Sequence, residues 1–234
     1  MLLTLAALLP LLVGAQSGPI KKDMVVGKGA PARAGDLLVV DYKGSLANGK
    51  VFDQSFGMAP FSFTLGKGEV IKGWDLGIAG MRVGGRRMLT IPSSLGYGRA
   101  GSPPDIPADA TLKFEVRLYH IWPRGSSPRV IVKDVKVGKG RAAKQGDSVE
   151  VHYKGTFPNG VKFDSSYDRK QPLPVTIGAG GVIPGFDKGL IGMKVGGRRK
   201  VTIHPQLAYG ERGAGGVIPP NATIVFELEL VKIK

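Results

Sequence analysis

A long stretch of this chain occurs twice. Residues 81–92 read MRVGGRRMLTIP, and residues 193–204 read MKVGGRRKVTIH. The offset of 112 positions also relates Tyr97 to Tyr209. Solenoid repeats are only about 20–50 residues long, so a repeat of this length is a whole domain. The chain therefore folds as two tandem domains of roughly 105–110 residues, each large enough for its own core.

Composition excludes several kinds of site. With no cysteine, the chain has no disulfide, thiolate nucleophile or cysteine-ligated zinc, and its three histidines match no metal spacing. Residues 96–101 match G-x-G-x-x-G, but a dinucleotide site needs a helix directly afterwards, and Ser102-Pro103-Pro104 prevents one. We expect no metal and no cofactor. The 36 glycines favour turns and short strands.

The net charge of +15 is uneven, with +5 in residues 17–123 and +10 in residues 124–234. Basic surfaces attract nucleic acid, anionic lipid or acidic proteins. Because the basic residues are scattered, we interpret them as a solubilising surface and expect no nucleic-acid partner. Arg198, Arg199 and Lys200 keep open the alternative of a basic scaffold.

The N-terminus has the pattern of a signal peptide. Residues 2–13 are apolar except for Thr4 and Pro10, too few to span a bilayer, and no Lys or Arg precedes them. Val13-Gly14-Ala15 supplies the small residues that a signal peptidase recognises. We expect residues 1–15 to be removed and the protein to be exported to a periplasm, the medium or a secretory lumen, with no membrane span left.

The rest of each copy predicts an antiparallel sheet with one short helix, an α+β fold. Residues 35–44 form an apolar strand, and Asn48-Gly49 and Asn159-Gly160 predict type I′ hairpin turns. Two strands alternate with period two, which buries one face of each. The buried residues are Leu112, Phe114, Val116 and Leu118, and then Ile224, Phe226, Leu228 and Leu230.

A helical spacing of i, i+4 and i+7 occurs once per copy. It relates Trp74, Ile78 and Met81, and then Phe186, Leu190 and Met193. The joint between the copies lies near residues 123–128 and is short, so we expect the domains, 17–123 and 124–234, to sit close together.

Several blocks in the right order carry a family resemblance. In the first copy these are YKGSLANGKVFD, VIKGWDLGIAGMRVGG and LGYGRAG; in the second, HYKGTFPNGVKFDSS, VIPGFDKGLIGMKVGGRRKVTI and LAYGERGAGGVIPPNATIVFELEL. The chain resembles the FKBP-type peptidyl-prolyl cis/trans isomerases over nearly all of residues 23–234. The resemblance implies two tandem FKBP-like domains, each a twisted antiparallel sheet half-wrapped around one short helix.

The resemblance also implies an aromatic pocket between helix and sheet. Trp74 would form its floor, and the Tyr97 hydroxyl and Ile71 N–H would reach substrate carbonyls. Catalytic positions carried over by matching are Tyr42, Phe52, Asp53, Ile71, Trp74, Tyr97 and Phe114, and in the second copy Tyr153, Phe163, Asp164, Ile183, Phe186, Tyr209 and Phe226. Substrate-binding positions are Phe61, Val70, Ile106, Leu173, Val182, Val217 and Ile218.

The chain departs from the family pattern at the pockets. Asp105 replaces a usual aliphatic residue at the lip of the first pocket, and Ser102 and Ala214 are small lip residues. Phe186 replaces the floor tryptophan and Leu173 an aromatic wall in the second pocket, so we expect weaker binding of macrolide inhibitors there.

These residue types suit prolyl isomerisation of client polypeptides. Rotation about X–Pro crosses a barrier of about 18–20 kcal/mol held up by amide resonance. A pocket that withdraws water favours the twisted, less dipolar amide. Asp53 and Asp164 would orient substrate rather than transfer protons. A non-catalytic module that captures proline segments as a holdase is the alternative, and we expect a monomer.

Overall fold

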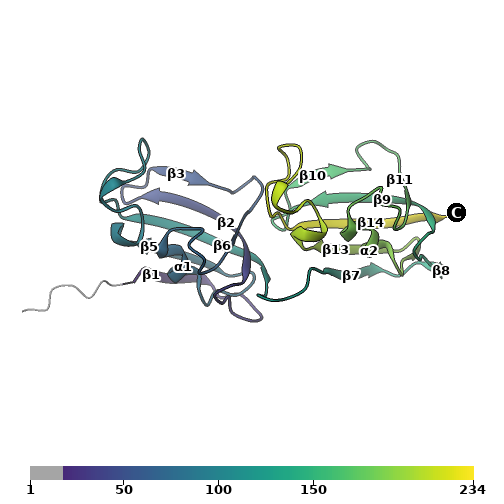
Figure 1. Ribbon diagram of the computed structural model, residues 1–234, viewed down its shortest axis with the longest axis horizontal. Helices are drawn as coiled ribbons and strands as arrows, with labels where there is room; N and C mark the ends of the chain where they lie inside the picture. Colours follow the sequence, from purple (N-terminus) through teal and green to yellow (C-terminus); the bar gives the residue numbers. More distant parts are fainter. Residues whose placement is uncertain (1–17) are drawn as a thin grey trace, which may run out of the picture.

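The computed structural model describes residues 18–234, so the predicted signal peptide lies outside the described part. Two six-stranded antiparallel sheets lie one after the other along the long axis of the molecule (Figure 1). The first is built from β1 (Ile20–Val25), β2 (Leu37–Leu46), β3 (Val51–Gln54), β4 (Phe61–Thr64), β5 (Arg86–Ile91) and β6 (Leu112–Trp122). The second is built from β7 (Val130–Lys136), β9 (Ser148–Thr156), β10 (Lys162–Ser165), β11 (Leu173–Thr176), β13 (Arg198–Ile203) and β14 (Ile224–Ile233).

The two sheets have the same strand order. In the first, the order is β1-β5-β6-β2-β3, and β4 pairs with the other half of the long β2; in the second, it is β7-β13-β14-β9-β10, with β11 on β9. A small extra ribbon joins β8 (Lys139–Ala142) to β12 (Lys194–Val195), where the first domain has only a single bridge. The duplication in sequence is thus a duplication of topology.

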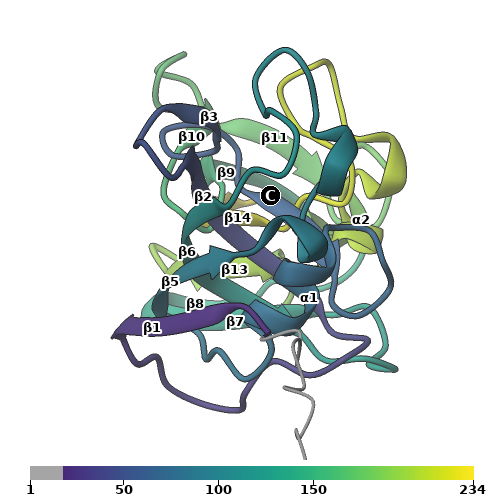
Figure 2. The ribbon, with the colours of Figure 1, turned by 90° about the vertical axis from the view of Figure 1, so that its left-hand side faces the viewer.

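One short helix packs on each sheet: α1 (Lys72–Ile78) and α2 (Pro184–Leu190). Figure 2, viewed from the end of the first domain, shows α1 lying across one face of its strands. Helix α1 ends at Ile78, before the last residue of the predicted i, i+4, i+7 set. Ala79, with ψ 134°, and Gly80, with φ +83°, both have non-helical backbone angles. Met81 therefore follows the helix, although it is still buried. Four single turns of 3₁₀ helix complete the structure, at Ser93–Leu95, Gly98–Ala100, Pro205–Leu207 and Gly210–Arg212.

The predicted alternation in β6 and β14 is confirmed. Every one of the eight apolar residues named for these strands is buried, at 5% exposure or less. Each set joins the helix residues in its own domain's core, and the two cores are separate clusters. Each copy therefore buries its own apolar residues, as expected of two domains.

The hairpin prediction is correct in position and wrong in turn type. Asn48 and Asn159 do not have positive φ; only the following Gly49 and Gly160 do, at +90° and +93°. Gly49 N–H bonds to Leu46 C=O, so the loop is a type I turn followed by a left-handed glycine, the usual three-residue hairpin. The extra residue leaves each asparagine side chain free to accept the N–H two positions on.

A buried arginine ties three elements together in each domain. Arg199 on β13 donates two hydrogen bonds to Asp134 on β7 and two more to the carbonyls of Gly189 and Ile191 at the end of α2. Arg87 repeats this with Asp23 on β1 and the end of α1. Each arginine thereby links the edge strand, the neighbouring strand and the C-terminus of the helix. It also donates hydrogen bonds to carbonyls at the helix end that have no partner within the helix.

The two domains contact each other directly. Trp122, at the end of β6, is 1% exposed, and its indole N–H donates to the Thr223 hydroxyl of the second domain at 2.8 Å. Its ring packs edge-on against His204, and the Arg129 guanidinium lies 5.9 Å from the ring centre. The short joint thus brings the domains close together, as its length predicted, and the structure adds a packed interface at Trp122.

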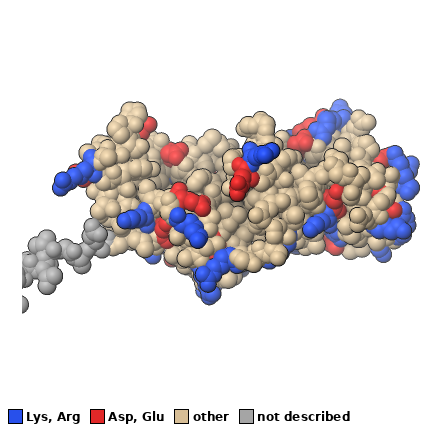
Figure 3. Space-filling model, in the orientation of Figure 1, with Lys and Arg blue, Asp and Glu red and all other residues tan. Residues whose placement is uncertain are grey.

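Charges of both signs are interspersed on the face seen in Figure 3, with no continuous basic patch. Of the three residues that favoured a basic scaffold, Arg199 is buried and Arg198 pairs with Glu229. No helix within residues 18–234 has the length and apolar character needed to cross a membrane.

We predict that Arg199→Ala lowers the free energy of unfolding by about 2 kcal/mol, because it leaves buried carbonyls and Asp134 without their partner. Arg198→Ala is the matched control. Its side chain is 60% exposed, and the loss of its ion pair should cost less than about 1 kcal/mol. Urea unfolding of both variants checks this, and equal losses would contradict it.

The same ion pairs predict acid sensitivity. Hydrogen bonds from Arg199 and Arg87 lower the pKa of Asp134 and of Asp23 below the ordinary value. A depressed pKa means that the stabilisation is present above the unfolded pKa, and is lost as pH falls below about 4 through the lower folded value. The melting temperatures of wild type and Asp134→Asn should therefore differ at pH 7 and converge as the pH falls below about 4. A gap that stays constant would contradict the assignment.

Candidate active site

The first cavity lies between α1 and its sheet and has a volume of about 280 Å³. Strands β2, β3, β4 and β6 form its walls, and α1 with the segment before it forms its base. Its lining residues are Tyr42, Phe52, Asp53, Phe61, Glu69, Val70, Ile71, Trp74, Tyr97 and Phe114. All of the predicted first-copy residues except Ile106 are brought together here.

Aromatic rings set the shape of this cavity. Trp74 is 4% exposed, and its ring meets those of Tyr42 and Phe114 edge to face at 5.1 and 5.2 Å between centroids. Phe52 packs edge-on against Phe114 in the same way. Such T-shaped contacts hold rings at fixed angles. The walls are therefore rigid as well as apolar.

The second cavity is larger, about 380 Å³, and occupies the same place on the second sheet. Its lining residues are Tyr153, Phe163, Asp164, Leu173, Gly181, Val182, Ile183, Phe186, Tyr209, Ala214, Gly215, Val217, Ile218 and Phe226. Every predicted second-copy residue is among them. The extra volume agrees with a phenylalanine at the position of Trp74 and a leucine at that of Phe61.

Each cavity holds one tyrosine–aspartate pair. The Tyr42 hydroxyl donates to Asp53, and the Tyr153 hydroxyl donates to Asp164 at 2.5 Å. Burial, followed by the neighbouring carboxylate, raises the pKa of both tyrosines above the ordinary value. Both hydroxyls therefore remain protonated donors at neutral pH. In each pair, one carboxylate oxygen of the aspartate accepts the hydrogen bond of the tyrosine hydroxyl.

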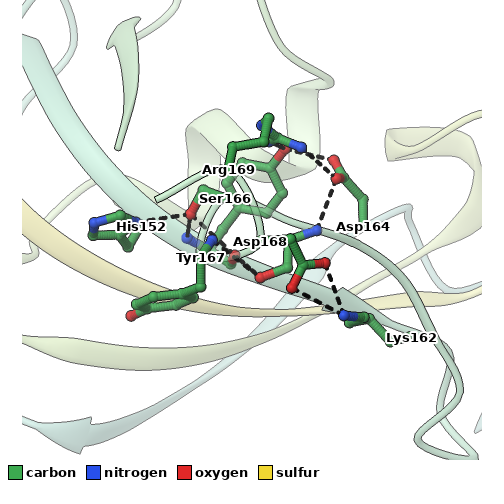
Figure 4. Close-up of polar contacts among 9 residues, drawn as sticks. His152, Lys162, Asp164, Ser166, Tyr167, Asp168 and Arg169 are labelled. Carbon is green, nitrogen blue, oxygen red and sulfur yellow. Dashed lines mark hydrogen bonds and ion pairs between the residues drawn. The ribbon is translucent and has the colours of Figure 1, made fainter. Parts of the chain in front are cut away.

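Arg169 is a site residue that the sequence did not reveal. From the segment between β10 and β11 it donates to Asp164 at 2.7 Å and to the Tyr153 hydroxyl at 2.5 Å, as Figure 4 shows for the carboxylate. Burial acts to raise the pKa of Asp164, but hydrogen bonds from Tyr153 and Arg169 outweigh it and lower that pKa. The first copy has no counterpart of Arg169, so the repeat between the two copies did not indicate this residue.

Groups that can meet a substrate carbonyl are unpaired. Ile71 and Ile183 directly precede α1 and α2, and within residues 18–234 their N–H groups donate to no protein acceptor. Tyr97 and Tyr209, at 41% and 36% exposure, stand at the cavity mouths on 3₁₀ turns. These donors frame an otherwise apolar cleft.

Two predicted lip residues are not among those that line the first cavity. Ile106 is 5% exposed and belongs to the core beside the first cavity, whereas its counterpart Ile218 lines the second. Asp105 is exposed and lies 3.7 Å from Lys50 Nζ, away from the cavity lining. Glu69 does line the first cavity, but its carboxylate accepts the N–H of Thr64. Over residues 18–234, no cluster of His, Asp and Glu is arranged to hold a metal ion.

Sequence comparison places this arrangement in a known family. The model of the family described as FKBP-type peptidyl-prolyl cis-trans isomerase matches residues 28–119 and 139–231. The chain belongs to the FKBP family. The two matched segments contain both cavities, so the chain is a tandem FKBP protein, in agreement with the resemblance seen in its sequence blocks.

Relatives with one and with several domains are similar to this chain. Human "Peptidyl-prolyl cis-trans isomerase FKBP10" is 40% identical over 200 residues, which is 85% of this chain and 34% of the human protein. The "FK506-binding protein" of Neisseria meningitidis serogroup A is 55% identical over 104 residues, 44% of this chain and 95% of that protein. The crystal structure of the three FKBP domains of wheat FKBP73 covers 93% of this chain and 95% of its own, at 26% identity and a TM-score of 0.43. This chain spans about a third of the length of the mammalian relatives it matches.

We predict that Gly155→Ala closes the second cavity. A Cβ at Gly155 would lie 2.6 Å from Phe163 and 2.9 Å from Phe226, so these two rings, which line the cavity, must shift. Titration with a proline peptide, followed by NMR, should show at least a roughly tenfold weaker affinity at the second cavity, about 1.4 kcal/mol. The first cavity of the same molecule is the control. Unchanged affinity at the second cavity would contradict the prediction.

Proposed function

We propose that both domains catalyse cis/trans isomerisation of X–Pro bonds in client polypeptides. The observation that carries the proposal is the composition of the two cavities. Each is an aromatic cleft in which the aspartate carboxylate already accepts a hydrogen bond from a tyrosine hydroxyl. Such a cleft offers an apolar surface for a proline ring and hydrogen-bond donors for the carbonyls beside it. A reaction that breaks no covalent bond fits it.

The cavity would act by differential binding. The planar amide has a resonance-stabilised charge on its oxygen, which water solvates, whereas the twisted amide is less dipolar. Removal of water by the ring of Trp74 or Phe186 thus favours the twisted form. The N–H of Ile71 or Ile183 and the hydroxyl of Tyr97 or Tyr209 would hold the flanking carbonyls in place. Each ~1.4 kcal/mol of such preference speeds rotation about tenfold.

The proposal extends to clients and inhibitors. The apolar segment at residues 2–13 supports folding assistance to exported proteins, and the packed domains would engage two prolines of one client. One relative is named for binding FK506, and we expect macrolides to enter both cavities. Binding should be weaker at the second, because its cavity is larger and less filled.

A holdase without catalysis is the second candidate. Phe186 at the floor of the second cavity favours it, because a larger, less filled cavity would remove water from the amide less completely. In that case one cavity, or both, would only capture proline segments of unfolded clients.

A protease-coupled isomerisation assay on the full chain tests the proposal. The samples are wild type, Gly44→Ala, Gly155→Ala and the double variant. Gly44 matches Gly155, with a Cβ that would lie 2.6 Å from Phe52. Each single variant should lose the contribution of one cavity, and the folded double variant should lose roughly tenfold or more of kcat/KM. Wild-type protein that lacks activity yet prevents aggregation of a client would favour the holdase.

A further inference from the structure

The tyrosine–aspartate pair is supported differently in the two cavities. In the second, Arg169 bonds both members of the pair. In the first, the corresponding segment, residues 55–60, is one residue shorter than residues 166–172 and contains no basic residue. Within residues 18–234, Asp53 accepts a hydrogen bond only from Tyr42. The first cavity therefore lacks the internal clamp that the second has.

The second domain contacts this segment instead. Asn159, in the β9–β10 turn, donates from Nδ2 to the Met58 carbonyl at 2.8 Å and to both carboxylate oxygens of Asp41 at 3.2 and 3.3 Å. Ala59, next along the segment, packs against the hydrophobic core of the second domain. Residues 55–60 thus lie between their own sheet and the second domain.

A short hydrogen-bond path leads from Asn159 to the cavity wall. Asp41 is 2% exposed and accepts the Ser55 hydroxyl at 2.8 Å. The Ser55 oxygen accepts the N–H of Tyr42 at 3.0 Å, and the N–H of Ser55 donates to the Tyr42 carbonyl. Ser55 therefore bonds both the N–H and the C=O of Tyr42, whose ring lines the cavity. The hydroxyl of Ser55 and the amide of Asn159 both donate to the carboxylate of Asp41.

The second cavity has the same serine–tyrosine backbone bonds, but not the aspartate that links them to another domain. There Ser166 takes the position of Ser55, and its hydroxyl meets His152 where the first domain has Asp41. The matching turn asparagine of the first domain, Asn48, bonds only the N–H of Lys50 in its own turn. The arrangement is specific to the first cavity and to the second domain as its partner.

We propose that Asn159 is a positioning residue for the first cavity: through Met58 and Asp41, the second domain holds Tyr42 in place, as Arg169 holds Tyr153. This rests on the proposed function, since it assumes that the first cavity binds proline segments. A consequence is that the first domain binds its substrate well only when the second is docked against it.

Asn159→Asp is the sharpest test. It keeps the side-chain oxygen that accepts the N–H of Val161, but replaces the donor with a charge facing buried Asp41. Asn48→Asp makes the same change in the same kind of turn with no carboxylate bonded to it. Asn159→Ala removes the donor without adding charge. All three are made in the full chain.

Affinity at each cavity is read in one NMR titration with an Ala-Leu-Pro-Phe peptide. The chain has two tryptophans, so the indole signal of Trp74 reports the first cavity, and the amide of Ile183 reports the second. Asn159→Asp and Asn159→Ala should weaken binding at the first cavity about fivefold, at the lower end of typical coupling between sites. Affinity at the second cavity, and both affinities in Asn48→Asp, should stay at wild-type values.

The outcomes separate the two proposals. If Trp74 titrates with the same affinity in Asn159→Asp as in wild type, Asn159 only joins the domains and the positioning role is wrong. If both cavities weaken equally, the change is a general loss of structure and the role is also wrong. If the peptide shifts neither signal in wild type, the proposed function itself fails.

Discussion

Close contact between a short helix and its sheet is the constraint on which both sites depend. A Cβ at Gly73 would lie 2.3 Å from Ile91, and one at Gly185 would lie 2.3 Å from Ile203, so only glycine allows this approach. Seven-residue helices are too short to be stable alone and need this packing. The approach brings Trp74 and Phe186 to the cavity floors, and places Ile71 and Ile183, which directly precede the helices, among the lining residues.

The two copies share the helix–sheet packing but differ in the residues that line their cavities. The strand order, the buried arginines and the tyrosine–aspartate pairs are the same in both copies. The floor residue, the lip residues and the support of the aspartate are not. The proposed catalysis by water exclusion would tolerate such changes, because it requires an apolar surface and oriented donors, with no particular acid or base. Two domains of one chain can thus differ in affinity while they share one mechanism.

The interface between the domains contains specific buried hydrogen bonds. It includes a fully buried tryptophan with its hydrogen bond satisfied, and an asparagine amide that reaches a buried carboxylate. Buried polar groups are costly when they are left unpaired, so these bonds favour one relative placement of the domains. A fixed placement would set the distance between two bound prolines and would also allow one domain to influence the cavity of the other.

The sequence by itself determined the tandem α+β organisation, the buried faces of β6 and β14, the positions of the hairpins and nearly all cavity-lining residues. The organisation, buried faces and hairpins follow from repetition, period-two patterns and turn signals, whereas the cavity-lining residues follow from the resemblance to the FKBP family, carried over position by position. Tertiary structure decided the turn type, the end of α1 before Met81, the burial of Arg199, and the contacts of Arg169 and Asn159. Each of these depends on partners distant in the chain or present in only one copy, and neither local periodicity nor a comparison of the two repeats contains that information.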